Sequence, residues 1–354
     1  MNKRIQEWID ERTGLTGFIN FLKKKKVPQH TYTFWYFWGG AILMLFGIQV
    51  ITGILLLLYY KPTIDAAHKS VAQIMTEVPL GWIIRSMHRW TAYFMIAFVF
   101  VHLFTTLILK AYRRPREFTW ITGSLLLIIT LAFGFTGYLL PWDELSLSAT
   151  KVGTDIPRTF PVVGFWVTKL LRGGEDVTGE TLTRFFAVHV SLLPLLILAL
   201  IGLHVLLIQK HGMSVPLSIE SRKNEIPQIL FFPNFFYRES IFWLIIFGLI
   251  VTLALIFPPS LGKEADLMAP APEGVKPEWY FLFLFQALKL FPSKILFING
   301  DTFAVFLILI IGLIFFFLPF IDKKPEGRTG QIITYLAYLG LIYVIVMTIW
   351  GYLA

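Results

Sequence analysis

Residues 81–109 read GWIIRSMHRWTAYFMIAFVFVHLFTTLIL. Beyond its first few positions the stretch is apolar, and about 20 mostly apolar residues cross a bilayer as a helix. It nevertheless contains two histidines, His88 and His102. A polar side chain inside a membrane is costly, so it usually faces a partner or a cofactor. The stretch therefore predicts a transmembrane helix, from about Ile83 to Leu109, that holds something polar.

Six further segments share this length and apolar character, so we predict an all-α integral membrane protein with seven transmembrane helices. The other six are Phe34–Tyr60, Thr119–Leu140, Phe185–Ile208, Ile241–Pro258, Thr302–Ile321 and Ile332–Ala354. Hydrophobic residues make up 56% of the 354 residues and charged residues 15%, whereas soluble domains carry about a quarter charged residues. These values exclude a disordered chain and argue against a soluble domain. The polar first 30 residues predict no cleavable signal peptide.

Two long loops, 143–184 and 259–301, each contain a shorter apolar stretch. Phe160–Leu171 and Trp279–Phe291 are too short to span a membrane, so we expect helices that lie at its interface. Ile5–Leu22 is expected to form a further surface helix on the opposite side.

Basic residues gather on one side of the predicted membrane. The N-terminal segment and the loops on its side hold 18 of the 31 Lys and Arg residues but 9 of the 22 acidic residues. The positive-inside rule then places the N-terminus, with Lys23–Lys26, in the cytoplasm and the C-terminus outside. We expect a multi-pass protein of a bacterial inner membrane. The net charge of +9 reflects this orientation and not binding to nucleic acid.

Four of the seven histidines lie inside two predicted spans: His88 and His102 in the second, His189 and His204 in the fourth. Both spans run from outside to inside, so His88 and His189 share the outer level, and His102 and His204 the inner level. His88 and His102 are 14 residues apart, and His189 and His204 are 15 apart, so on an α-helix each pair is separated by roughly 21–22 Å along the axis. The two side chains of a pair then point to within roughly 40° (14 residues) or 60° (15 residues) of the same helix face. Pro194 can bend the fourth span between its two histidines.

This pattern favours two haems, each with two axial histidines. Zinc would need thiolates, carboxylates or an open site, and none is nearby. The chain has no cysteine, which excludes disulfides, iron–sulfur ligation and thioether-attached haem. Glycines repeat with the same period, so a glycine can face each ring; they are Gly39 and Gly53 in the first span and Gly123 and Gly137 in the third. Close helix packing is the alternative for the glycines, but four histidines at one period favour haem.

Arginines stand near both histidine levels and could bind the anionic haem propionates. Arg85 and Arg89 flank His88, Arg184 precedes His189, and Arg114 follows the second span. We expect propionate contacts mainly from Arg85 and Arg184. The alternative is that these side chains only reach the membrane interface.

Together these residues resemble cytochrome b of the quinol-oxidising bc and b/f complexes, over nearly the whole chain. The stretches that carry the resemblance are GWIIRSMHRW (81–90), KAYRRPRE (110–117), GYLLPWD (137–143), LTRF (182–185) and PEWYF (277–281). The histidine spacing of 15 and the end after seven spans are closest to the b/f branch, with its short cytochrome fused to its subunit IV. The resemblance implies a cytoplasmic segment at 1–33, a four-helix di-haem domain at 34–211, a linker at 212–239 and a three-helix domain at 240–354.

Two positions depart from that branch. Phe37 stands where the branch has the cysteine that attaches a third haem, so no covalent third haem is expected. Gln209 replaces an arginine that follows the inner ligand, which leaves Lys210 and His211 as candidates for the inner quinone site.

The resemblance also implies a reaction. Glu278 would accept a proton from quinol at an outer site, with Tyr280 and the segment after Pro141 lining that site. Pro277, Trp279 and Tyr138 would be further contacts there. One electron would pass to a Rieske iron–sulfur protein and then to a c-type cytochrome. The other would cross two non-covalent b haems to an inner quinone, coupled to proton translocation in a Q cycle.

Because the chain lacks thiolates, the iron–sulfur and c-type centres must belong to partner proteins. The resemblance further implies a homodimer within a multisubunit, lipid-embedded complex. Two alternative functions remain. A di-haem anchor that passes electrons between a dehydrogenase and quinone would lack the Glu278 segment and the long outer loops. A haem-free transporter would lack the shared period of histidine and glycine.

Overall fold

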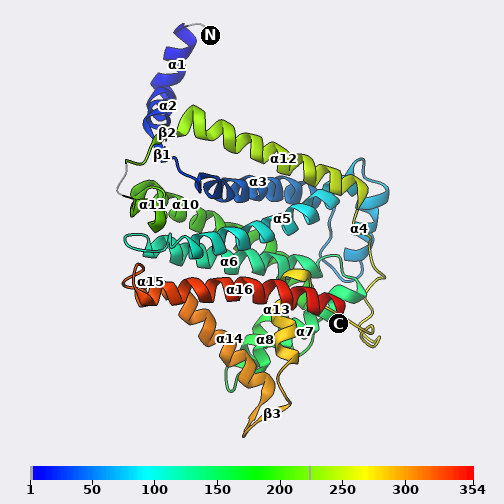
Figure 1. The fold of residues 1–354 in the computed structure, drawn as a ribbon. Coiled ribbons are helices and arrows are strands. Elements are labelled where there is room, and N and C mark those ends of the chain that lie inside the picture. Colours follow the sequence, from blue (N-terminus) through cyan, green and yellow to red (C-terminus); the bar gives the residue numbers. More distant parts are fainter. Residues whose placement is uncertain (1–2, 223–224) are drawn as a thin grey trace.

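Long apolar helices lie side by side and form the body of the molecule (Figure 1). The computed structural model describes residues 3–222 and 225–354. Within these residues, six helical segments are long and apolar enough to cross a membrane, and one more is shorter. They are built on α3 (Phe37–Leu57), α5 (Gly81–Ile108), α6 (Glu117–Leu139), α9 and α10 (Gly179–Ala187 and Leu193–His211), α12 (Phe236–Ile256), the shorter α14 (Gly300–Phe316) and α16 (Arg328–Leu353). The predicted all-α membrane architecture is confirmed.

The sixth predicted span differs most from its prediction. Thr302–Ile321 was expected to be one helix, but α14 ends at Phe316 and the short α15 (Leu318–Ile321) follows. Pro319 has no N–H to donate to the preceding turn, so an uninterrupted helix would lose a backbone hydrogen bond there. The break leaves α14 with 17 residues.

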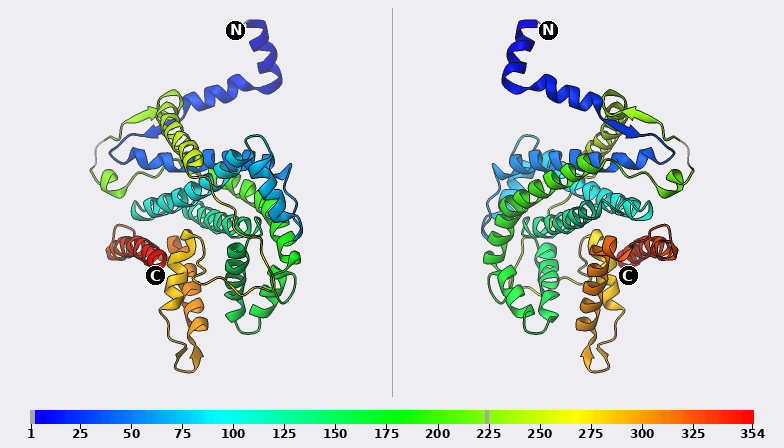
Figure 2. Two further views of the ribbon diagram at one scale, coloured as in Figure 1. Left: turned by 90° about the vertical axis from the view of Figure 1, so that its right-hand side faces the viewer. Right: turned by 90° about the vertical axis from the view of Figure 1, so that its left-hand side faces the viewer.

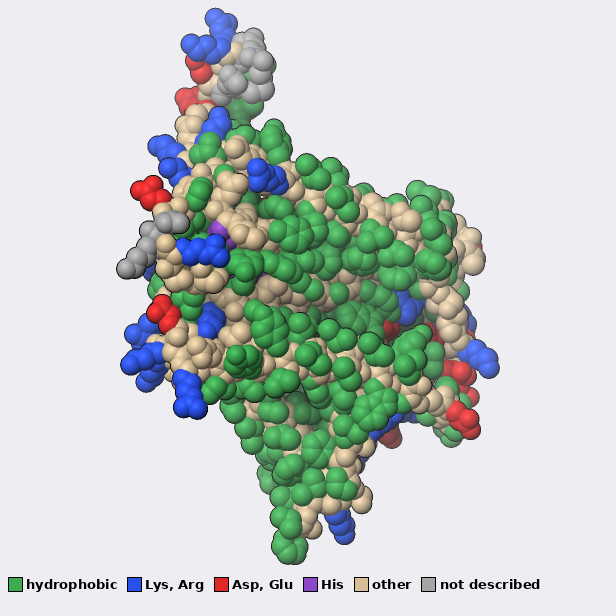
Figure 3. Space-filling view, viewed as in Figure 1, with side chains coloured by type: hydrophobic (Ala, Val, Ile, Leu, Met, Phe, Trp, Pro, Cys, Tyr) green, Lys and Arg blue, Asp and Glu red, His purple; other side chains and the backbone are tan. Residues whose placement is uncertain are grey.

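The two ends of the bundle differ in charge (Figure 3). We call the end where α3, α6 and α12 begin the basic end, and the opposite end the loop end. The first described residues lie beyond the basic end, and the C-terminus lies at the loop end (Figure 1). The predicted segment 1–33 and linker 212–239 lie at the basic end, except that residues 1–2 and 223–224 lie outside the described residues.

A small antiparallel sheet ties the N-terminal segment to the linker at the basic end. β1 (Lys26–Pro28) pairs with β2 (Gln228–Leu230), with Val27 opposite Ile229. The remaining elements at this end are η1 (Thr33–Tyr36), α11 (Leu217–Glu220) and the π-helical turn η4 (Phe231–Phe235). Buried Val27, Phe37 and Phe235 join the sheet to the starts of α3 and α12.

The predicted surface helix Ile5–Leu22 is two helices, α1 (Lys3–Thr13) and α2 (Leu15–Lys24). Gly14 separates them with a φ of +62°, a backbone conformation that glycine adopts without steric cost. The pair extends away from the bundle (Figures 1 and 2).

The loop end is built from short helices and one hairpin. They are α4 (Ala67–Thr76), α7 (Glu144–Asp155), η2 (Pro157–Thr159), α8 (Gly164–Arg172), α13 (Trp279–Lys289), β3 (Lys294–Ile295) and β4 (Ile298–Asn299). The two predicted interfacial stretches correspond to α8 and α13. The α8 helix starts only at Gly164, after Pro161 and after Val162 with its φ of +66°.

Buried side chains from four helices form the main core between the two ends. Leu45 of α3, Met95 of α5, Ile197 of α10 and Ile250 of α12 belong to one cluster. By contrast, the outer faces of α12, α14 and α16 expose many large apolar side chains, which give the green surface across the middle of Figure 3. Such a surface suits contact with lipid.

Candidate functional site

Two histidines face each other near the loop end. The ring centroids of His88, on α5, and His189 lie 6.5 Å apart, and their planes cross at 65°. His189 lies in the π-helical turn η3 (Val188–Leu192), which joins α9 to α10. The pair predicted for the outer level is therefore brought together.

Threonine hydroxyls lie within hydrogen-bond distance of both Nδ1 atoms of this pair. Thr52 Oγ1 lies 2.9 Å from Nδ1 of His88 and donates its own proton to the carbonyl of Ile48. Thr136 Oγ1 lies 3.1 Å from Nδ1 of His189 and donates to the carbonyl of Ala132. A hydroxyl carries one proton, so in both contacts the histidine Nδ1–H is the donor. The neutral imidazole then carries its lone pair on Nε2, which is the form that binds metal.

The second pair lies nearer the basic end, on the same two helical segments. Thr122 Oγ1 lies 2.8 Å from Nδ1 of His204, on α10, and donates to the carbonyl of Phe118. His204 is close enough to His102, on α5, to interact with it electrostatically. The buried Nδ1 of His102 has no hydrogen-bond partner among the described residues. The 14 residues between His88 and His102 put the two levels roughly 21 Å apart.

Each predicted glycine faces one histidine. A Cβ at Gly53 would lie 3.4 Å from Cε1 of His88, and one at Gly137 would lie 2.7 Å from Cε1 of His189. At the other level, a Cβ at Gly39 would lie 3.8 Å from Cε1 of His102, and one at Gly123 would lie 3.2 Å from Cε1 of His204. Gly123 and Gly137, both on α6, thus make room for the imidazoles of His204 and His189, whereas a Cβ at Gly39 or Gly53 would make ordinary van der Waals contact.

The three threonines were missed by the sequence analysis, although the sequence carries a signal for them. Each directly precedes one of these glycines: Thr52 and Gly53, Thr122 and Gly123, Thr136 and Gly137. The fourth glycine, Gly39, follows Trp38 instead. Accordingly, its histidine, His102, is the one whose Nδ1 lacks a partner.

The π-helical turn explains the unequal histidine spacings. On a regular helix, 15 residues would rotate His204 roughly 60° from His189. A π-helical turn contains one more residue than an α-helical turn. The 15 residues from His189 to His204 therefore rotate about the helix axis by nearly the same angle as the 14 residues from His88 to His102 on α5. Pro194, expected to bend this helix, lies just after the turn.

A cavity of about 420 Å³ opens at the loop end. Its lining comes from α5, α6, the start of α13 with the segment before it, and the end of α16, and includes the predicted Tyr138, Pro277, Glu278 and Trp279. The other lining residues are Tyr93, Lys276, Leu282 and Tyr352. This cavity brings most of the predicted quinol-site residues together.

The Glu278 carboxylate is held by two side chains of α5. Tyr93 donates a hydrogen bond to Oε2 at 2.7 Å, and Arg89 lies 3.3 Å from Oε1. Arg89 also donates from Nε to the Tyr93 hydroxyl at 2.9 Å. The Glu278 side chain is 11% exposed, so its charge is compensated within the protein. Tyr93 was not predicted, although it follows Arg89 by four residues and so shares its helix face.

Tyr280 lies outside the lining of this cavity. It is buried, and its ring packs beside Gly134 of α6, where a Cβ would lie 2.7 Å from the hydroxyl. The segment after Pro141 forms α7, which contributes nothing to the same lining. It lies instead against the loop that follows α12, where the backbone N–H of Glu144 donates to the carbonyl of Lys263.

The arginines predicted for propionates contact the protein itself. Arg85 donates to the carbonyls of Pro259 and Ser260, and Arg184 to the carbonyl of Leu170. Arg114 is 84% exposed and pairs with Glu117 at 3.4 Å.

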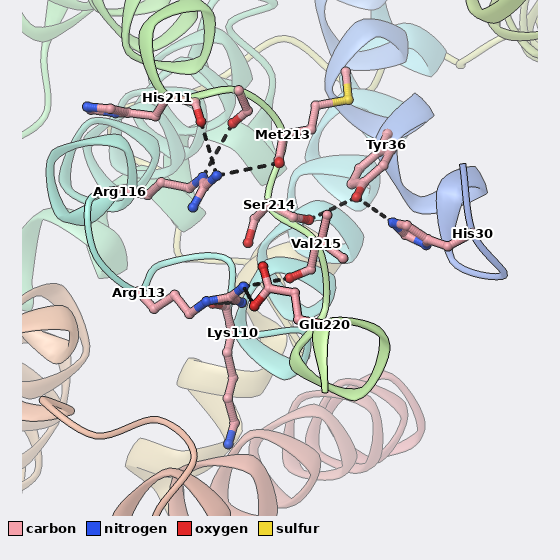
Figure 4. Close-up of polar contacts among 11 residues, drawn as sticks. His30, Tyr36, Lys110, Arg113, Arg116, His211, Met213, Ser214, Val215 and Glu220 are labelled. Atoms are coloured by element: carbon pink, nitrogen blue, oxygen red, sulfur yellow. Dashed lines mark hydrogen bonds and ion pairs between the residues drawn. The ribbon is translucent and has the colours of Figure 1, made fainter. Parts of the chain in front are cut away.

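Polar contacts hold the start of the linker at the basic end (Figure 4). Arg116 donates to the carbonyls of residues 211–213, and Arg113 to the carbonyl of Val215. Arg113 also pairs with Glu220 at 2.6 Å. The pKa of Arg116 is lowered by burial and then by the charge of Arg113. Of the two inner-site candidates, His211 has a buried Nδ1 without a partner among the described residues, and Lys210 precedes it on α10.

Comparison with known proteins identifies the family. The family model "Cytochrome b/b6/petB" matches residues 22–212, more than half of the chain. The chain belongs to the cytochrome b family. A second model, "Cytochrome b(C-terminal)/b6/petD", matches residues 264–354 of this cytochrome b. Membership of the family implies haem binding.

Individual relatives agree with the family models. The chain is 44% identical over 343 residues to a "Cytochrome bc complex cytochrome b subunit" of Chlorobaculum thiosulfatiphilum, covering 96% of this chain and 79% of the relative. It is 42% identical over 213 residues to a "Cytochrome b6" of Prochlorococcus marinus, covering 60% of this chain and 97% of the relative. A solved structure titled "Hyperthermophilic respiratory Complex III" matches with a TM-score of 0.86 and 31% identity, covering 98% of this chain and 90% of that one.

Proposed function

We propose that this cytochrome b is the quinol-oxidising subunit of a bc-type complex. The observation that carries the proposal is the Glu278 carboxylate, which lines a cavity of about 420 Å³ and is positioned by residues of the helix that bears His88. The similarity to a cytochrome bc complex subunit and to a Complex III structure supports it.

We infer two non-covalent b haems, one ligated by His88 and His189 and one by His102 and His204. The donor set fits: at three of the four imidazoles a threonine hydroxyl accepts a hydrogen bond from Nδ1–H, and Gly123 and Gly137 leave space beside His204 and His189. Haems held in this way would supply one-electron carriers at two levels of the membrane, roughly 20 Å apart. Arg85, Arg89, Arg184 and Arg114 are the proposed propionate partners. Phe37 and the lack of cysteine support the expectation that no third haem is attached covalently.

Glu278 would act as the base for quinol oxidation. A quinol hydroxyl in the cavity would donate its proton to the carboxylate, while Tyr93 and Arg89 hold the carboxylate in place. General-base catalysis of this kind contributes typically 10²–10⁴-fold to a rate. The Arg89 side chain is 42% exposed, so the site has contact with solvent through which the proton can leave. Tyr280, buried behind this site, is proposed as a second residue of the reaction.

Charge and composition support proposals for the orientation of the chain in the membrane and for its partner proteins. The basic end would face the cytoplasm of a bacterial inner membrane, with the C-terminus outside. The second electron would reach a quinone near Lys210 and His211 at the basic end. A Rieske protein and a c-type cytochrome would supply the metal centres that this chain has no thiolates to bind. We also propose that the chain forms a homodimer. We further propose that it is divided into a di-haem domain at 34–211, a linker at 212–239 and a C-terminal domain at 240–354; two separate family matches support this division.

Glu278→Gln tests the proposal in the purified complex. It removes the base but preserves the shape of the side chain, so quinol-dependent cytochrome c reduction should fall at least about 100-fold while haem content stays unchanged. Glu273→Gln is the matched control, because Glu273 lies exposed in the same loop and should leave the rate unchanged. Equal rates in both variants would refute the role of Glu278.

A further inference from the structure

His102 is the exception among the four histidines of the two pairs. At each of the other three, a threonine hydroxyl lies 2.8–3.1 Å from Nδ1. The Nδ1 atom of His102 is buried and has no hydrogen-bond partner in the described part of the chain. When Nε2 of an imidazole binds a metal, Nδ1 carries a proton, and a buried N–H group without an acceptor is costly. The exception therefore needs a physical cause.

The cause lies on α3, where Trp38 takes the place that Thr52 has at the other level. The two residues are 14 positions apart, the same step as between His88 and His102. Each directly precedes a glycine that faces its histidine: a Cβ on that glycine would lie 3.8 Å from Cε1 of His102 and 3.4 Å from Cε1 of His88. A threonine at position 38 is therefore expected to reach His102 as Thr52 reaches His88.

Trp38 cannot serve as the acceptor that the threonine would be. Its indole has one polar group, an N–H, which only donates, and this group is itself buried without a partner among the described residues. The ring packs edge-on against Phe98, with 4.7 Å between centroids, and against Phe242 of α12 at 5.5 Å. Phe98 lies one turn before His102 on α5. Trp38 thus belongs to an apolar aromatic cluster beside the turn that carries His102.

A hydrogen bond at Nδ1 changes how strongly an imidazole donates electrons to a metal. An acceptor for Nδ1–H makes the ligand more basic, and a more basic ligand favours the oxidised metal, which has the higher charge. Hydrogen bonding around the axial ligands is one means by which a protein sets the potential of a haem. The His88–His189 pair has a threonine acceptor at both ligands, and the His102–His204 pair has one at His204 alone.

We propose that Trp38 is a positioning residue that keeps the midpoint potential of the haem at the His102–His204 pair above the value that a threonine at position 38 would give. It acts through His102, because it occupies the place of the acceptor for Nδ1–H. Trp38 thereby makes the two pairs chemically different, although both consist of two histidines. This inference rests on the two proposed haem sites.

The test is a potentiometric titration of the purified whole complex, in which the absorption of reduced haem is followed against the applied potential. Trp38→Thr and Trp38→Val leave nearly the same space on α3, but only threonine supplies an acceptor. Relative to Trp38→Val, Trp38→Thr should favour the oxidised form of one haem about tenfold, which lowers its midpoint potential by about 59 mV. The other haem should titrate alike in both variants. His204→Ala assigns the component that shifts, because it should remove that component.

Thr52→Val provides a second measurement, in case position 38 does not accept a small side chain. It removes the acceptor from His88, so the midpoint potential of the haem at the His88–His189 pair should rise by a similar amount. Equal midpoint potentials in Trp38→Thr and Trp38→Val would overturn the inference, and so would an unchanged potential in Thr52→Val, because a purely packing role predicts both results. If the wild-type complex contains no b-type haem, the proposed function fails instead.

Discussion

Thr122 Oγ1 lies 2.8 Å from Nδ1 of His204 and accepts its hydrogen bond, because the hydroxyl proton is already donated to the carbonyl of Phe118. The same arrangement recurs at Thr52 with His88 and at Thr136 with His189. Each threonine therefore provides an acceptor for the Nδ1–H of a histidine on a neighbouring helical segment, and His189 and His204 also have a backbone partner, Phe133 and Thr119 respectively. Metal-binding histidines commonly depend on such partners.

Thr122→Val should weaken the haem nearer the basic end. Valine keeps the volume but cannot accept the Nδ1–H hydrogen bond, and loss of such a partner typically costs 10–100-fold in metal affinity. Haem loss on dilution in detergent, followed spectroscopically, measures this. Thr130→Val is the control, since in the described part of the chain the Thr130 hydroxyl bonds only to the carbonyl of Leu126. Equal haem retention in the two variants would show that the threonine contact is unimportant.

Gly137→Ala should expel the haem nearer the loop end. The added Cβ would lie 2.7 Å from Cε1 of His189, closer than packed carbon atoms approach, so the imidazole must move. Gly47→Ala, on α3, adds a Cβ with nothing within 4 Å and should leave haem content intact. The haem content of the two purified variants checks this, and a fully loaded Gly137→Ala chain would contradict the proposed role of the glycines.

Tyr93→Phe should slow quinol oxidation roughly tenfold. It removes the 2.7 Å hydrogen bond to the Glu278 carboxylate, and a hydrogen bond to a charged group is worth about 1.5–3 kcal/mol. The fall should appear in kcat more than in KM, because the ring that lines the cavity remains. Tyr335→Phe, which removes an exposed hydroxyl, serves as control. A wild-type kcat for Tyr93→Phe would remove Tyr93 from the mechanism.

Arg172→Met should destabilise the loop end without touching the histidines. Arg172 is 2% exposed and bonds to Thr154 Oγ1 and to the carbonyls of Lys151 and Glu175, at 2.7–2.9 Å. Removing it leaves buried acceptors unpaired, at about 1–3 kcal/mol for each fully buried group. The thermal midpoint should fall clearly below that of Lys169→Met, whose side chain is 51% exposed. Equal midpoints would contradict this.

The sequence predicted the membrane helices and the pairing of histidines well, because apolar length and a constant period report directly on helices in a membrane. Helix ends were predicted less well where one residue decides them, as at Gly14 and at Pro319. The threonine partners could be identified only from the structure, because each threonine contacts a histidine on a different helix. Tyr93 was missed for the same reason: its partner, Glu278, lies 185 residues further along the chain.

One non-covalent haem in each of the two histidine pairs is the basis of the proposed function. Its most direct test is the amount of extractable haem b per chain, measured as the pyridine haemochrome in the purified wild type, His189→Ala and His204→Ala. We expect two haems in the wild type and one in each variant, all removed by acid acetone. A wild type without b-type haem, haem that resists extraction, or two haems in both variants would contradict it.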